Sequence, residues 1–156
     1  MKGGAPWDHG LAARIVEEHS ARQGATLPML HALQERFGYV DPAAVPLIAQ
    51  ALNLSKAEVH GVVSFYHDFR RAPVDGAVLK LCRAEACQAM GCRDLAAHAR
   101  ERLGVALGET TGDGRVTLEA VYCLGLCATA PSAMIDGRVL GRLTPARLDA
   151  ALEALG

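Results

Sequence analysis

The sequence lacks several features that would at once assign it to a functional class. Aromatic residues make up only 4% of its 156 residues, so the core must be built from Ala, Leu and Val. The formal net charge is −1, which argues against nucleic acid as a partner, because phosphate binding needs a concentrated basic face. The chain has no glycine-rich phosphate loop and no dinucleotide fingerprint, so we expect neither flavin nor NAD to bind to it directly.

The sequence also lacks long apolar runs and any Cys-x-x-Cys pair. The first residues contain no apolar stretch of the kind that a secretory signal needs. The longest uncharged run, residues 120–135, is too short to span a bilayer. We therefore expect a cytoplasmic protein without direct membrane contact. No two cysteines have the Cys-x-x-Cys spacing of thioredoxin-type catalysts, and the six histidines are scattered, so no catalytic residue is predicted.

The sequence does contain five cysteines, four of them in two pairs. Four residues lie between Cys82 and Cys87, and three lie between Cys123 and Cys127. Because structural disulfides are rare in the cytoplasm, these cysteines indicate metal or redox chemistry. Four thiolates without a histidine fit a [2Fe–2S] cluster best and zinc second, whereas a Rieske centre would need two histidines close to the cysteines.

The fifth cysteine, Cys92, repeats the spacing between Cys82 and Cys87. It lies on the apolar stripe of the helix predicted over residues 88–103. We therefore expect Cys92 to be a buried core residue and not a ligand.

The first half of the chain is predicted to form a small helical bundle over residues 1–72, with residues 1–10 as a flexible lead-in. Four helices are expected at residues 11–23, 28–37, 42–52 and 55–66. Gly24 and Gly38 are expected to end the first two. Pro46 predicts a late start or a kink in the third helix, and Ser55 with Glu58 forms a capping box that opens the fourth.

Residues 73–156 are predicted to form a second domain of thioredoxin-like β-α-β-ββ-α order, which makes the chain α+β. The expected elements are strands at 77–81 and 116–122, a helix at 88–103, a hairpin of 132–135 with 138–140, and a last helix after Thr144. The two strands of a β-α-β unit run parallel, so their carboxyl ends lie at one edge of the sheet.

That topology predicts how the distant cysteine pairs come together. Cys82 and Cys123 each follow a parallel strand and begin a loop that supplies the second cysteine, Cys87 or Cys127. Both loops enclose the crevice where α/β folds place ligands. Gly125 is expected to let backbone N–H groups approach the sulfurs, and Pro131 is expected to follow a cis peptide bond.

Three further segments are LPMLHALQERFGY (27–39), VVSFYH (62–67) and YCLGLC (122–127). Together they resemble the thioredoxin-like [2Fe–2S] subunit family, which includes the small flavin-associated subunit of respiratory complex I and subunits of NAD-linked hydrogenases and formate dehydrogenases. The resemblance implies that Cys82, Cys87, Cys123 and Cys127 are the cluster ligands and that Cys92 is not. It also implies an electron-transfer subunit bound to a partner that carries FMN, the NAD site and further iron–sulfur clusters.

Within this family, residues 82–91 and 127–134 are most similar to the gamma subunit of molybdenum-dependent NAD⁺ formate dehydrogenase. This similarity implies a large partner subunit in which a molybdenum cofactor oxidises formate to CO₂ and NAD⁺ is reduced to NADH. The alternatives are the equivalent subunit of complex I or of an NAD-linked hydrogenase. A structural zinc module and a thiol–disulfide protein remain as further alternatives.

Overall fold

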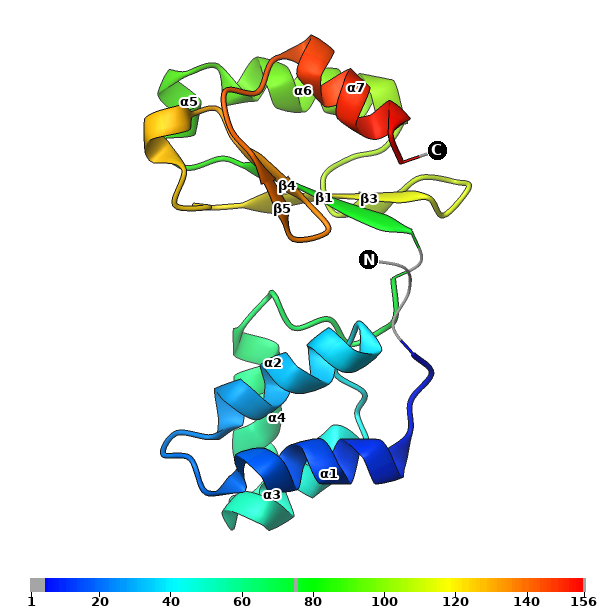
Figure 1. Ribbon diagram of the computed structural model, residues 1–156, viewed down its shortest axis with the longest axis vertical. Coiled ribbons are helices and arrows are strands. Elements are labelled where there is room, and N and C mark those ends of the chain that lie inside the picture. The colour runs from blue at the N-terminus through cyan, green and yellow to red at the C-terminus, as the bar shows by residue number, and fades with distance from the viewer. Residues whose placement is uncertain (1–4, 75, 156) are drawn as a thin grey trace. The chain divides into compact units, whose positions relative to one another are not determined.

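The computed structural model describes residues 5–74 and 76–155, which form two compact units (Figure 1). The first unit is helical and ends at Val74, and the second contains the described residues from Gly76 onward. Each unit has its own apolar core. No helix among the described residues is both long and apolar enough to cross a membrane.

The first unit consists of four helices, as the sequence predicts. They are α1 (His9–Ser20), α2 (Thr26–Phe37), α3 (Ala44–Leu52) and α4 (Lys56–Phe65). Apolar residues spaced three and four apart place one side of each helix in a shared core, which includes Leu30, Leu33, Phe37 and Ile48. Trp7 packs on Phe37, with ring centroids 4.8 Å apart.

The ends of these helices are set by capping residues and prolines. α1 begins at His9, two residues earlier than predicted, because the Asp8 carboxylate accepts a hydrogen bond from the Leu11 N–H (2.8 Å). It also ends earlier than predicted, at Ser20, so Gly24 lies in the following turn and is not its cap. Residues 1–4 of the predicted lead-in lie outside the described residues.

α2 begins at Thr26, two residues earlier than predicted, whereas the features below agree with the sequence patterns. Gly38 ends α2 with a left-handed backbone. α3 starts late, at Ala44, so Pro46 lies in the first turn, where no intrahelical hydrogen bond is lost. The capping box of α4 is complete, since Ser55 and Glu58 each bind the backbone N–H of the other.

The second unit contains a five-stranded sheet in the order β2-β3-β1-β4-β5. Its strands are β1 (Ala77–Cys82), β2 (Glu109–Thr110), β3 (Val116–Val121), β4 (Ala133–Ile135) and β5 (Arg138–Leu140). β1 and β3 are parallel, and all other neighbouring pairs are antiparallel. This arrangement confirms the predicted α+β class and the thioredoxin-like order, with β2 as an additional strand that the sequence did not predict.

The helices of this unit are α5 (Glu85–Ala89), α6 (Cys92–Leu103) and α7 (Pro145–Glu153). Figure 1 shows α6 and α7 over the same face of the sheet, where alternate residues of β1 (Ala77, Leu79 and Leu81) join Leu95, Ala99 and Leu148 in the core. The hairpin turn at Asp136–Gly137 and the Thr144 cap of α7 are found as predicted.

The prediction of one continuous helix over residues 88–103 is wrong. The chain forms α5 first, then breaks at Met90 and Gly91, and then begins α6 at Cys92. Gly91 has a φ of 84°, which an L-residue adopts only under strain, so this glycine permits the change of direction. Cys87 consequently lies within a short helix and not in a loop.

Candidate metal centre

The carboxyl ends of β1 and β3 bring the two cysteine pairs to one edge of the sheet. Cys82 is the last residue of β1 and is paired in register with Val121, two residues before Cys123. The Arg83 N–H donates to the Val121 carbonyl (2.8 Å), which holds the two strand ends together. The parallel arrangement that the sequence predicted is therefore present.

Short helical turns supply the second cysteine of each pair. Cys87 lies in α5, and Cys127 begins the 3-10 turn η1 (Cys127–Thr129). These two elements contact each other. Between Cys123 and Cys127, Gly125 adopts a φ of 73° and donates its N–H to the Cys123 sulfur at 3.3 Å. We predicted from Gly125 that a backbone N–H would approach the sulfurs, and this hydrogen bond is observed.

The sulfur atoms are arranged as two pairs. The Sγ atoms of Cys123 and Cys127 lie 4.0 Å apart, and the Cys87 side chain hydrogen-bonds to Cys82. Two thiolates bound to one tetrahedral metal with bonds of about 2.3 Å lie about 3.8 Å apart, so the measured Cys123–Cys127 separation fits one shared metal. Each pair can therefore supply two ligands to one of two metal ions.

A [2Fe–2S] cluster has two irons and takes two thiolates at each, which matches two pairs of thiols. A structural zinc ion takes four ligands around one centre. Within the described part of the chain, no group of three or more His, Cys, Asp or Glu side chains is placed to hold a single ion.

The two pairs differ in their exposure to solvent. Cys82 and Cys87 are 3% and 2% exposed, whereas Cys123 and Cys127 are exposed. Tyr122 beside the second pair is also 74% exposed. A metal cluster bound here would have one side in the apolar interior and the other at the surface.

Hydrogen bonds favour the ionised form of Cys82 in spite of its burial. Burial alone would raise the pKa of its thiol, but N–H groups of Ala84 and Leu124 and the side chains of Cys87 and Ser132 outweigh that effect, so the pKa is lowered. The pKa of Cys127 is raised, first by its side-chain hydrogen bond with Cys123 and then by the Coulombic interaction with that neighbouring sulfur. Neighbouring thiolates thus repel, and a cation bound between them relieves this repulsion.

Cys92 is buried, as the sequence predicted, at 3% exposure. It is the first residue of α6 and packs in one cluster with Cys82 and Cys87. Burial, and then the charge of Cys87, raises the pKa of the Cys92 thiol. Cys92 therefore remains a neutral thiol beside the ligand candidates.

Ser132 is a site residue that the sequence analysis missed. It is 2% exposed, and its Oγ lies 3.5 Å from the Cys87 Sγ. Its carbonyl accepts the Cys82 N–H at 3.0 Å. Ser132 directly follows the Ala130–Pro131 peptide bond, which is cis as predicted. Its place between this proline and an apolar strand is visible in the sequence, but its cysteine partners follow only from the packing of β4 beside β1.

Comparison with known proteins identifies the class to which this fold and site belong. Residues 12–156 match the thioredoxin-like [2Fe–2S] ferredoxin family, and the chain belongs to that family. Its cofactor is accordingly a [2Fe–2S] cluster, as the cysteine pattern predicted.

Similar individual proteins are found in several oxidoreductase complexes. The chain is 35% identical over 132 residues to a subunit of the NADH-quinone oxidoreductase of Pseudomonas aeruginosa, covering 85% of this chain and 80% of that protein. It is 32% identical over 136 residues to the HndA component of the NADP-reducing hydrogenase of Solidesulfovibrio fructosivorans, covering 86% of this chain and 79% of that protein.

Other relatives are longer than this chain. The match to the corresponding NADH-quinone oxidoreductase component of Mycobacterium tuberculosis is 36% identical over 134 residues and covers 86% of this chain but 53% of that protein. The crystal structure of an air-oxidised NAD⁺-reducing [NiFe]-hydrogenase matches with a TM-score of 0.70 and 28% identity. That match covers 83% of this chain and 22% of the hydrogenase chain, so the matching module there is part of a much longer polypeptide.

Proposed function

We propose that Cys82, Cys87, Cys123 and Cys127 hold the [2Fe–2S] cluster and that the chain is an electron-transfer subunit of an NAD-linked oxidoreductase complex. The observation that carries this proposal is the meeting of two thiol pairs at one sheet edge in a chain of this family. When bound, such a cluster accepts and donates single electrons.

The chain's own residues would hold the ligand sulfurs and stabilise their negative charge. N–H groups of Ala84 and Leu124 point to Cys82, and that of Gly125 points to Cys123. The Ser132 hydroxyl adds a side-chain partner for Cys82 and Cys87. These donors favour the more negative, reduced state, whereas the buried apolar surroundings disfavour it.

The proposed partner subunit carries FMN, the NAD site and further iron–sulfur clusters. The names of the similar proteins include NADH, NADP and NAD⁺ as reactants of their complexes. This chain has no dinucleotide fingerprint of its own. We assign the cluster to domain 73–156 and partner binding chiefly to the helical domain 1–72, in the cytoplasm, where free thiols persist.

For the complex itself, we propose a formate dehydrogenase of the molybdenum-dependent, NAD⁺-reducing type. The support is the similarity of residues 82–91 and 127–134 to its gamma subunit. The formate site would then lie on a large molybdenum-containing partner. The names of the relatives favour a second candidate, the equivalent subunit of complex I or of an NAD-linked hydrogenase.

Iron analysis and electron paramagnetic resonance (EPR) spectroscopy test the ligand assignment. The purified chain should contain two irons and give a rhombic EPR signal after reduction. Serine substitution of Cys82, Cys87, Cys123 or Cys127 should abolish or alter that signal, whereas Cys92→Ala should leave it unchanged. A colourless protein with one zinc, or a metal-free reversible disulfide, would replace this proposal with one of the alternatives.

Purification of the native complex tests the identity of the partners. Molybdenum in the complex together with formate-dependent formation of NADH would support the formate dehydrogenase assignment. Quinone-dependent oxidation of NADH, or hydrogen-dependent reduction of a nicotinamide nucleotide, would instead assign the chain to the second candidate.

A further inference from the structure

A preformed apolar hollow lies on the helical unit, between the beginning of α3 and one side of α4. We call it the α3–α4 groove. Its lining includes three valines, Val40, Val45 and Val63, which we call the valine floor; Val40 and Val63 are buried. Its volume is about 370 Å³, which falls in the range of about 300–1,000 Å³ that is usual for ligand pockets. The groove can therefore accept apolar side chains of a partner.

Two prolines and a capping box restrict the backbone of the segments that line the groove. Pro42 and Pro46 line one side, and each fixes its own backbone φ. On the other side, the start of α4 is held by the capping box of Ser55 and Glu58. A preformed groove loses little conformational entropy on binding, which favours affinity.

Three basic side chains surround this apolar floor. Lys56 and His60 lie one turn apart on α4, and Arg71 follows that helix. None of the three forms an ion pair with an acidic side chain among the described residues.

Asp41 is the acidic residue among the described residues that line the groove, and its carboxylate is hydrogen-bonded within the fold. Both carboxylate oxygens of Asp41 accept hydrogen bonds, one from the Tyr39 hydroxyl (3.0 Å) and one from the Ala43 N–H (2.8 Å). The Asp41 carboxylate is therefore held in place by neutral donors of the fold, and it forms no ion pair with Lys56 or Arg71 among the described residues.

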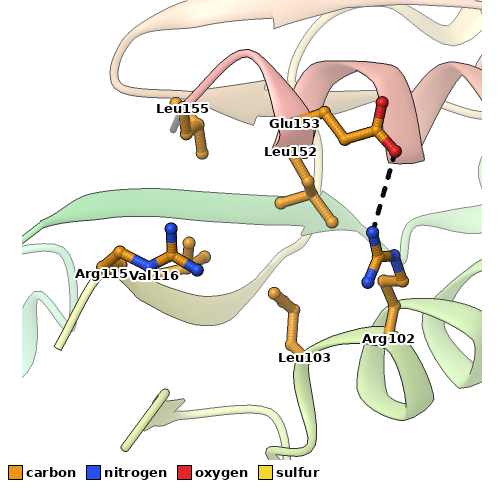
Figure 2. Close-up of a pocket in the computed structure, with 7 residues that line it drawn as sticks. All are labelled: Arg102, Leu103, Arg115, Val116, Leu152, Glu153 and Leu155. Carbon is orange, nitrogen blue, oxygen red and sulfur yellow. Dashed lines mark ion pairs between the residues drawn. The ribbon is translucent and has the colours of Figure 1, made fainter. Parts of the chain in front are cut away.

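A second hollow, shown in Figure 2, provides a contrast, because its basic residues form ion pairs with acidic residues of the same chain. It has a volume of about 340 Å³ and is lined by Arg102 and Arg115. Arg102 lies 3.8 Å from Glu153, the ion pair that Figure 2 marks. Arg115 lies 2.7 Å from Asp113. The α3–α4 groove differs because none of its basic side chains forms an ion pair with an acidic residue in the described part of the chain.

We propose that the α3–α4 groove binds an acidic segment of the larger partner subunit. An aliphatic side chain of that segment occupies the valine floor, and its carboxylates bind Lys56, His60 and Arg71. The assignment to this partner rests on the proposed function. The occupant is inferred from charge and shape, because Lys56 and Arg71 suit carboxylates and the valine floor suits an aliphatic side chain.

Peptide titration of the full chain, followed by NMR, tests the chemistry of the groove directly. A short peptide of glutamate and leucine should shift the signals of residues around Lys56 and Val63, and added salt should weaken its binding. A matched peptide of lysine and leucine should not bind there. Equal binding of both peptides, or shifts only elsewhere, would overturn the proposal.

A double charge reversal, Lys56→Glu with Arg71→Glu, should weaken binding of the acidic peptide on the order of tenfold at low salt. The matched control is Arg14→Glu on the exposed surface of α1, which should leave the affinity unchanged. If the double variant is folded and binds the peptide as wild type does, the proposal is wrong.

The same variants in the co-expressed complex separate this proposal from the proposed function. The double variant should keep the EPR signal of the cluster but lose the larger subunit at lower salt than wild type or Arg14→Glu. Absence of the signal from the wild-type chain would contradict the proposed function, while the peptide titration would still report on the groove. Equal retention of the larger subunit by all three proteins would overturn the groove proposal.

Discussion

Ser132 connects both cysteines of the buried pair to the strand that follows the cis-proline. Its hydroxyl contacts Cys87 at 3.5 Å and hydrogen-bonds to Cys82, and its side chain is shielded from water. Hydrogen bonds to ligand sulfurs stabilise the reduced state of an iron–sulfur cluster. A single buried hydroxyl is therefore expected to tune the reduction potential.

Ser132→Ala should make the reduction potential more negative, because it removes a donor from the sulfurs. A hydrogen bond worth about 1 kcal/mol corresponds to about 40 mV for one electron. A redox titration followed by EPR measures the change. Thr117→Val, which removes a buried hydroxyl at the far end of β3, should leave the potential unchanged. A Ser132→Ala potential equal to that of wild type would contradict this role.

At the level of single elements, sequence patterns predicted the features that depend on local chemistry. The capping box at Ser55, the Asp136–Gly137 turn and the Gly38 cap all have a residue type that the backbone geometry requires. β2 could not be predicted, because it has only two residues, both exposed, and thus no alternation of apolar and polar side chains.

The break between α5 and α6 was hidden by a pattern that continues across it. Cys92, Leu95 and Ala99 are spaced as in a helix that begins at Gln88, and nothing in that spacing locates Gly91 as a break. Convergence of the cysteines was predictable from the parallel strands. The contribution of Ser132 was not, because it depends on the three-dimensional packing of β4 beside β1.

Gly91→Ala should destabilise the second unit by about 1–2 kcal/mol, because the left-handed backbone is strained for alanine. The space around Gly91 is open, so a steric clash does not contribute. The control is Gly61→Ala in α4, where the space is also open and alanine should stabilise the helix by about 0.5–1 kcal/mol. Urea denaturation measures both effects. Equal effects of the two substitutions would argue against this interpretation of the break.

The capping box should make the stability of the first unit depend on pH. Hydrogen bonds from the Ser55 N–H and hydroxyl hold the pKa of Glu58 below its ordinary value. The ionised carboxylate therefore stabilises the folded state above the ordinary glutamate pKa, and this contribution is lost as pH falls through the lowered pKa.

Glu58→Gln should consequently reduce stability at neutral pH and have no effect at strongly acidic pH, where the wild-type carboxyl is protonated. Chemical denaturation across this pH range checks the trend. Ser55→Ala removes the cap itself and should cost about 1 kcal/mol. A Glu58→Gln effect that is the same at every pH would show that the charge does not contribute.

At the level of the whole molecule, two separate apolar cores imply that each unit has its own free energy of unfolding. Leu30, Leu33 and Phe37 belong to one core, and Leu79 and Leu118 belong to the other. The cysteines all lie in the second unit. Because metal binding contributes to folding free energy only where the ligands are, the cluster should stabilise one unit and not the other.

Removal of iron should therefore increase amide hydrogen exchange in β1, β3 and α5 and leave α1–α4 unchanged. Hydrogen exchange with mass spectrometry on the holo and apo proteins measures this difference. The exchange of α2, which carries much of the first core, is the internal control. Increased exchange throughout both units would indicate a single cooperative structure instead.

The unequal exposure of the two cysteine pairs also has a consequence for how the cofactor is delivered. Cys123 and Cys127 are accessible to a donor protein, whereas Cys82 and Cys87 are enclosed by Val121, Leu124 and Ala130. Maturation should thus begin at the outer pair, and the inner pair should be engaged last. The same order makes Cys123 and Cys127 the first thiols that an alkylating reagent modifies in immature protein, so cofactor insertion and chemical damage compete for the same two atoms.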